Sequence, residues 1–169
     1  ADFGAAIGSD ENLREVFRAE ITESVGTLRA AFDAGVPLAT GSESGFSLTP
    51  YGDWHYRELQ VFVEDLGMTP LQAINSATEQ GARALKLEGE LGCVKPDYLA
   101  DILIFDGEPE THITQLGDAD RFRHIIKDGR LVDTSTPLPK EWQLPGWRVS
   151  EYSERILTKE LVQSMGLNP

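Results

Sequence analysis

Apolar residues recur at steps of three and four through residues 10–34, and this period predicts a long helix with one apolar stripe. The stripe consists of Leu13, Val16, Phe17, Ile21, Val25, Leu28 and Phe32. Ser9 and Asp10 precede it, and either residue is a suitable N-cap. Gly35 stands just past the last apolar position, where helices commonly end in a left-handed residue.

Two further helices are predicted between residues 54 and 86. The first covers residues 54–66, whose apolar positions form one buried side before Gly67. The second covers residues 70–86 and has a strong start signal. Thr69 can cap this helix, Pro70 suits its first position, and Gln72 can reach back to complete a capping box.

A short apolar run at residues 36–40 predicts a strand after the first helix. It is apolar on both faces, which fits a parallel strand covered on both sides. The order of helix and then strand is typical of an α/β repeat. The small polar run GSESG, residues 41–45, follows directly.

The apolar period changes after residue 90. Residues 91–94, 100–105 and 121–127 are predicted as strands. The pair Asp128-Gly129 indicates a tight hairpin turn that leads into residues 130–132.

These elements divide the chain into three segments. Residues 1–88 form an α/β segment, 89–136 a small β segment, and 137–169 a Pro- and Trp-containing surface wrap followed by a helix. One strand flanked by three helices cannot close a sheet, so the α/β segment is expected to need neighbouring strands from elsewhere. The chain has 169 residues, whereas a complete (β/α)₈ barrel typically needs about 250.

Composition and charge exclude several kinds of partner. The chain has 15 Lys and Arg against 28 Asp and Glu, a formal charge of −13, which argues against nucleic acid and anionic membranes as partners. No apolar run approaches the ~20 residues of a membrane span, and no signal peptide is recognisable before the first helix. The single cysteine, Cys93, cannot form an internal disulfide. We therefore expect a folded protein of the cytoplasm.

One carboxylate stands out as a candidate for chemistry. Glu43 directly follows the predicted strand, and ligands gather at the C-terminal ends of parallel strands. A carboxylate there could bind a divalent cation and take a proton from water. The alternative is a solvated loop glutamate, and position alone does not decide between them. The run at 41–45 has Glu rather than Ser at its centre, so it is not a nucleophile elbow.

Several stretches, taken in order, resemble the C-terminal part of the metal-dependent amidohydrolase superfamily, on its imidazolonepropionase-like side. Residues 34–44, AGVPLATGSES, are similar to the last barrel strand of that family, usually AGV-x-L-x-x-GTDS. Residues 57–59 (REL), 67–74 and 77–78 resemble the helical stretch that follows. Residues 92–96 and 99–106 resemble the return into a small β-sandwich, and 126–132 resemble its closing hairpin.

The resemblance implies a C-terminal fragment of a distorted (β/α)₈ TIM-like barrel with part of a β-sandwich. It also implies one or two divalent metal ions, often zinc, and hydrolysis of amide, urea, carbamate or cyclic C–N bonds. The family's acid after the last strand, usually Asp, ligates the metal and transfers the proton of the attacking water; here that role falls on Glu43. The other family ligands would lie upstream of Ala1.

Three hypotheses follow, the third being that the chain is a fragment with no independent role. In the first, the chain is the C-terminal portion of an amidohydrolase that acts on a small molecule and is active only with the N-terminal barrel portion, within a homo-oligomer. Trp54 and His55 are then candidates to line the substrate pocket, the alternative being a helix N-terminus packed on its neighbour. In the second, the chain is a non-catalytic assembly or binding module whose metal site has degenerated.

Overall fold

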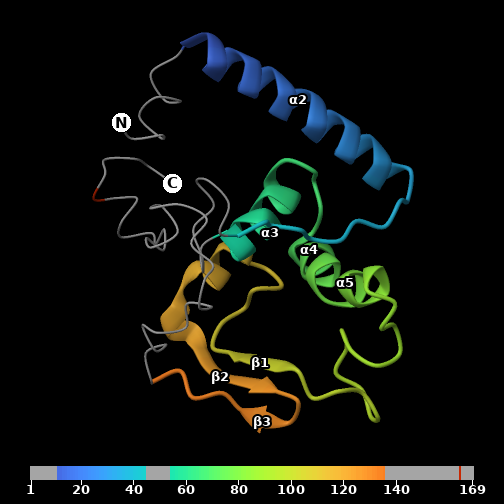
Figure 1. The fold of residues 1–169 in the computed structure, drawn as a ribbon, viewed down its shortest axis with the longest axis vertical. Coiled ribbons are helices and arrows are strands. Elements are labelled where there is room, and N and C mark those ends of the chain that lie inside the picture. Colours follow the sequence, from blue (N-terminus) through green and yellow to red (C-terminus); the bar gives the residue numbers. More distant parts are fainter. Residues whose placement is uncertain (1–10, 45–53, 136–163, 165–169) are drawn as a thin grey trace, which may run out of the picture.

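The predicted long helix is present as α2, Glu11–Asp33, in the computed structural model (Figure 1). The structure describes residues 11–44, 54–135 and 164, so the segment 137–169 lies outside the described residues apart from Ser164. α2 ends in a Schellman motif at Gly35, whose φ is +80°. The Gly35 N–H donates to the Phe32 carbonyl at 2.9 Å, and the next N–H, of Val36, donates to the Ala31 carbonyl at 3.0 Å.

The second and third predicted helices begin where the sequence indicates. α3 covers Trp54–Glu64 and α4 begins at Pro70. The capping box of α4 is formed. The Gln72 N–H donates to Thr69 Oγ1 at 3.3 Å, and the Thr69 N–H donates to Gln72 Oε1 at 2.8 Å.

The single helix predicted over residues 70–86 is wrong. The structure has two helices instead, α4, Pro70–Ala77, and α5, Glu79–Ala84. Thr78 separates them with φ −121° and ψ −86°, outside the helical region. Its hydroxyl donates to the Ile74 carbonyl at 2.8 Å and its N–H donates to the Asn75 carbonyl at 3.2 Å. The Thr78 hydroxyl and N–H thus satisfy carbonyls at the end of α4, a local alternative to continuing the helix.

The buried core lies between α3, α4 and the first of two 3₁₀ helices, η1, Ile113–Gly117. Its buried members are Leu59, Phe62, Leu66, Met68, Ala73 and Ile113. Val25 and Phe32 of α2 pack against this cluster. Ile113 therefore attaches the second half of the chain to the helical layer.

The strand predicted at residues 36–40 is not formed in the described part of the chain. This segment is extended but pairs with no described strand. Thr40 donates its N–H to the Ser76 carbonyl of α4 at 3.4 Å, so its partner is a helix end. A strand requires a neighbour on its hydrogen-bonding edge, and the described residues supply none here.

A three-stranded antiparallel sheet follows the helices. Its strands are β1, Ile102–Phe105, β2, Phe122–Lys127, and β3, Arg130–Leu131, in the order β1-β2-β3. The predicted turn between β2 and β3 is confirmed, because Asp128 and Gly129 have φ of 50° and 71°. Asp101 anchors that turn by accepting the Asp128 N–H at 2.7 Å and pairing with Lys127.

The strand predicted at residues 91–94 is also wrong. Leu91 forms only an isolated bridge with Glu88. Gly92 has φ +89°, which turns the chain out of the extended conformation. A Cβ on Gly92 would lie 2.8 Å from the Thr78 carbonyl oxygen, so the backbone runs closely against the α4–α5 junction.

The β-sandwich is not confirmed, because the described residues contain one sheet and a sandwich needs two. The sheet connects to the helices through η1 and η2, Ala119–Arg121. At the end of η1, Gly117 faces the ring of Tyr56 in α3, and a Cβ there would lie 2.6 Å from that ring. Residues far apart in sequence are thus in direct contact.

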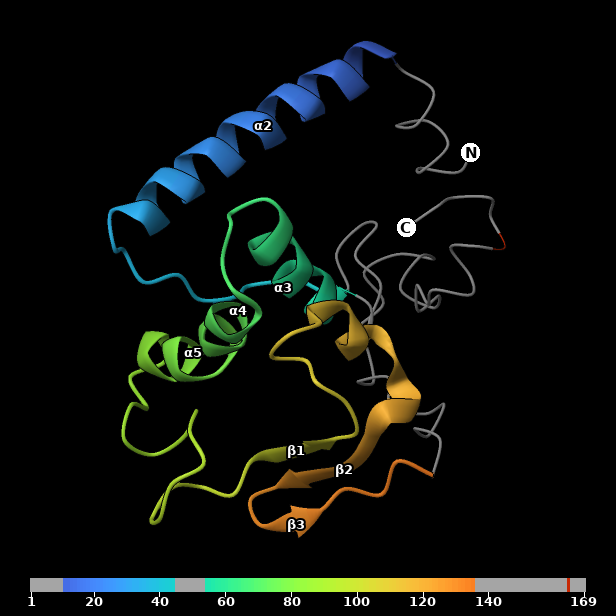
Figure 2. The same cartoon turned by 180° about the vertical axis from the view of Figure 1, so that it is seen from behind.

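α2 runs along the outside of the helical layer, as the two opposite views show (Figures 1 and 2). Four apolar side chains of its stripe remain exposed, namely Val16, Phe17, Ile21 and Leu28. The described residues therefore form a partial α/β unit with one uncovered apolar helix face. Among the described helices, none combines the length and apolar character needed to cross a bilayer.

Candidate functional site

The segment that carries Glu43 is tied to the helical layer at three consecutive residues. Thr40 is bound to the end of α4 as described above. The Gly41 N–H donates to Glu58 Oε1 at 2.8 Å, and Ser42 Oγ lies 3.1 Å from His55 Nδ1. We call residues 40–44 the acid loop. Its backbone path is set by side chains and carbonyls of α3 and α4.

Glu43 occupies a left-handed backbone conformation with φ +47°. This region is uncommon for residues other than glycine and carries a conformational cost of about 1 kcal/mol or more. Such strained positions cluster at functional sites. The side chain is exposed at the end of the segment 36–40, a position that fits both a reactive carboxylate and a solvated loop glutamate.

His55 and Glu58 reach the acid loop from one face of α3. They are three positions apart, a spacing that places two side chains on the same side of a helix. His55 is exposed and contacts Ser42, whereas Glu58 is half-buried. Trp54 is half-buried at the first position of α3. The structure thus brings His55 to the loop of Glu43, and it places Trp54 beside His55 at the helix start.

Burial has the largest effect on the pKa of the Glu58 carboxyl. Desolvation raises the pKa of this carboxyl above its ordinary value, while the bond from Gly41 and the nearby His55 oppose the shift. Only Oε1 is satisfied, because Oε2 is buried without a hydrogen-bond partner among the described residues. A half-satisfied buried carboxylate costs stability, and such groups occur frequently at functional sites.

We expect glutamine at position 58 to alter how stability depends on pH. Because the Glu58 pKa is raised, the folded state binds this proton more tightly than the unfolded state does. Lowering the pH through the folded pKa toward the ordinary value of 4.5 should therefore stabilise the wild type relative to Glu58→Gln. Urea unfolding of both proteins at about pH 7 and about pH 5 measures this difference. A difference in unfolding free energy that is equal at the two pH values contradicts the assignment.

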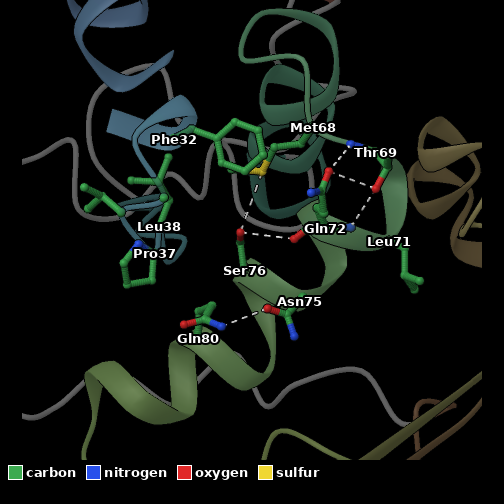
Figure 3. A pocket seen from close by; sticks show the side chains of 12 residues that line it. Phe32, Pro37, Leu38, Met68, Thr69, Leu71, Gln72, Asn75, Ser76 and Gln80 are labelled. Atoms are coloured by element: carbon green, nitrogen blue, oxygen red, sulfur yellow. Dashed lines mark hydrogen bonds between the residues drawn. The ribbon is translucent and has the colours of Figure 1, made fainter. Parts of the chain in front are cut away.

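A separate cleft of about 440 Å³ lies between the chain after α2 and helix α4 (Figure 3). Phe32 and Leu38 face it from one side, and Gln72 and Ser76 face it from the other. Neither Glu43 nor His55 nor Glu58 lines it. The cleft therefore belongs to a different surface from the acid loop.

The described residues do not hold a complete set of metal ligands. No group of three or more His, Cys, Asp or Glu side chains gathers within residues 11–44 and 54–135. The Glu43 carboxylate has the chemistry of one ligand to a divalent ion, but one donor is too few for a site. This part of the chain can contribute to a metal centre and cannot form one alone.

The sequence alone does not mark Glu58 or Ser42 as site residues. The available signal is the three-residue spacing of His55 and Glu58 on the next helix after the acid loop. That spacing gives a shared face, but it does not tell which segment the face covers. The contact with Gly41 spans 17 positions and required the fold.

Comparison with known proteins identifies the class. The sequence matches the Amidohydrolase family over residues 11–132, and the chain belongs to this family. It is 32% identical over 104 residues to imidazolonepropionase of Nocardia farcinica, a match covering 62% of this chain and 26% of that protein. It is also 32% identical over 104 residues to ochratoxinase of Aspergillus niger, covering 61% and 21%.

A solved structure gives the same relationship. A Xaa-Pro dipeptidase with methionine bound in its active site superposes with a TM-score of 0.57 at 33% identity, covering 64% of this chain and 25% of that one. The chain therefore spans about a quarter of the length of the relatives it matches. The resemblance noted in the sequence is confirmed, and these amidohydrolase neighbours imply a TIM-barrel-type fold of which the described residues are a partial α/β portion. Members of the family are hydrolases that typically use divalent metal ions.

Proposed function

We propose that this chain is the C-terminal portion of a hydrolase that cleaves a C–N bond in an amide, urea, carbamate or cyclic amide. The observation that carries the proposal is the position of Glu43. It combines the place of the family's acid in the sequence, an exposed carboxylate and a left-handed backbone fixed by α3 and α4. The named hydrolases among the relatives support the reaction class.

Glu43 transfers the proton in this reaction. The oxygen of a water molecule bonds to the carbonyl carbon, and its proton passes to the Glu43 carboxylate. The C–N bond then breaks, and Glu43 returns the proton to the leaving nitrogen. A divalent ion, which we propose to be zinc, would supply Lewis-acid polarisation and a more acidic water when bound. Its remaining ligands would come from outside the described residues.

The N-terminal barrel portion is the proposed partner that completes the site. The uncovered apolar face of α2 offers it a contact surface, and the cleft beside α4 offers a second. Inside that cleft region, Gln80 Oε1 is buried without a partner among the described residues. A barrel portion covering both surfaces would bury the apolar side chains and supply a donor.

Trp54 and His55 are proposed to border the substrate. Both lie at the start of α3, and His55 is hydrogen-bonded to Ser42 within the acid loop. The aromatic face of Trp54 suits the apolar part of a small organic molecule. His55 can present its other ring nitrogen to a polar group of that molecule.

The test is hydrolysis by the complete protein that carries this chain. Methionyl-proline, N-acetyl-methionine and imidazolone propionate are the probe compounds, measured before and after removal of metal by a chelator. We expect turnover of at least one probe, loss of turnover on chelation, and recovery when Zn²⁺ is added back. A protein that binds no metal and hydrolyses none of the three contradicts the proposal and favours the assembly module.

A further inference from the structure

The acid loop has an unusual attachment. Within residues 40–42, Gly41 is held by a carboxylate on the neighbouring helix, with 2.8 Å between the Gly41 nitrogen and Glu58 Oε1. Charge-assisted bonds of this kind are roughly twice as strong as neutral ones. Gly41 is two residues from Glu43, so its N–H anchors the backbone just before the left-handed residue.

The Glu58 carboxylate belongs to a part of α3 that packs on the core. Its helix neighbour Leu59 is buried in the core, so the backbone of α3 at this point is fixed by packing. Glu58 itself is half-buried, which restricts its side chain further. This hydrogen bond therefore connects the packed core to the loop of Glu43, beside the contacts that Thr40 and Ser42 make.

We propose that Glu58 is a positioning residue that sets the orientation of Glu43 through the Gly41 N–H. The inference rests on the proposed function of Glu43. Glu58 touches no reacting atom in this proposal, and its effect depends on reach to Gly41. Displacement of a catalytic group by about 1 Å can cost ~10²-fold in rate, so the loss of this anchor has a measurable consequence.

The length of the side chain separates this role from a purely electrostatic one. Glu58→Gln keeps an acceptor oxygen at the same distance, while Glu58→Asp keeps the charge but withdraws it by about 1.5 Å. If reach to Gly41 decides the effect, activity falls in the order Glu, Gln, Asp. If negative charge alone decides it, the order is Glu, Asp, Gln.

The experiment measures two quantities in the complete protein. The first is the split between kcat and KM with the probe hydrolysed fastest, and the second is hydrogen exchange of the Gly41 amide. For Glu58→Asp we expect kcat to fall by about 10- to 100-fold with little change in KM, and Gly41 exchange to accelerate about tenfold. Glu58→Gln should keep most of both properties.

Glu64→Gln is the matched control. Glu64 is exposed on the same helix and accepts a hydrogen bond from Gln60 at 2.8 Å. Its replacement should leave kcat and Gly41 exchange unchanged. Circular dichroism identifies any variant that fails to fold, and Gly41 exchange in the variant that does fold still reports on the anchor.

The outcomes separate this inference from the proposed function. Glu58→Asp with wild-type kcat and protected Gly41, beside an inactive Glu43→Gln, overturns the positioning role alone. An activity order of Glu, Asp, Gln also overturns it. Full activity of Glu43→Gln contradicts the proposed function of Glu43, and the positioning role of Glu58 is then overturned as well.

Discussion

Replacement of Glu43 by glutamine is expected to lower kcat by about 10²- to 10⁴-fold, the contribution typical of a positioned acid–base group. Glutamine keeps the size of the side chain and its polar oxygen but cannot accept the proton of water. Because the side chain is exposed, the fold should be unaffected. Steady-state kinetics of the complete protein, with Glu64→Gln as the control on an exposed glutamate, measures the effect.

Glu43→Asp examines the departure from the family pattern. The shorter side chain withdraws the carboxylate by about 1.5 Å, and a site built around glutamate should lose about 10²-fold in kcat. Retention of wild-type turnover by the glutamine variant would remove Glu43 from the mechanism. Equal turnover in the aspartate variant would show that the loop adapts to either length.

The second large effect concerns stability, and it falls on Gly92. Alanine there meets the Thr78 carbonyl oxygen at 2.8 Å and two carbon atoms of α5 at 3.0 Å, in a backbone with φ +89°. Backbone strain and overpacking add, so we expect Gly92→Ala to lower the free energy of unfolding by about 2–4 kcal/mol. The measurement is urea unfolding at constant pH.

Gly89 provides a matched control for that substitution. Its φ is +92°, almost that of Gly92, yet a Cβ there has no atom within 4 Å. Gly89→Ala isolates the backbone strain and should cost only about 1 kcal/mol. If the two variants have the same free energy of unfolding, the close approach at Gly92 does not contribute to stability.

Local signals in the sequence predicted the elements whose determinants are themselves local. The apolar period and Gly35 predicted α2 and its end, Thr69 and Gln72 predicted the start of α4, and Asp128-Gly129 predicted the hairpin. Each depends on residues within one or two turns of one another. The structure confirms these elements.

The wrongly predicted elements depend on contacts between distant residues, or on a local hydrogen bond that competes with the apolar period. The apolar period continues past Thr78, but its hydroxyl and N–H satisfy the end of α4 and the helix stops. Residues 36–40 have strand-like composition, yet a strand also requires an edge to pair with. The same holds for the candidate site. The sequence shows that Glu43 follows the apolar segment, but it does not show that Glu58 binds the loop at Gly41.

The close approach of Gly117 to Tyr56 limits which substitutions the protein can accept near the candidate site. Tyr56 lies between His55 and Glu58 along α3, so a bulkier residue at 117 displaces the helix turn that supports both loop contacts. Mutational libraries aimed at new substrates should therefore hold position 117 constant while varying the surroundings of Trp54. Libraries that instead vary both positions are expected to show covariation between 117 and 56.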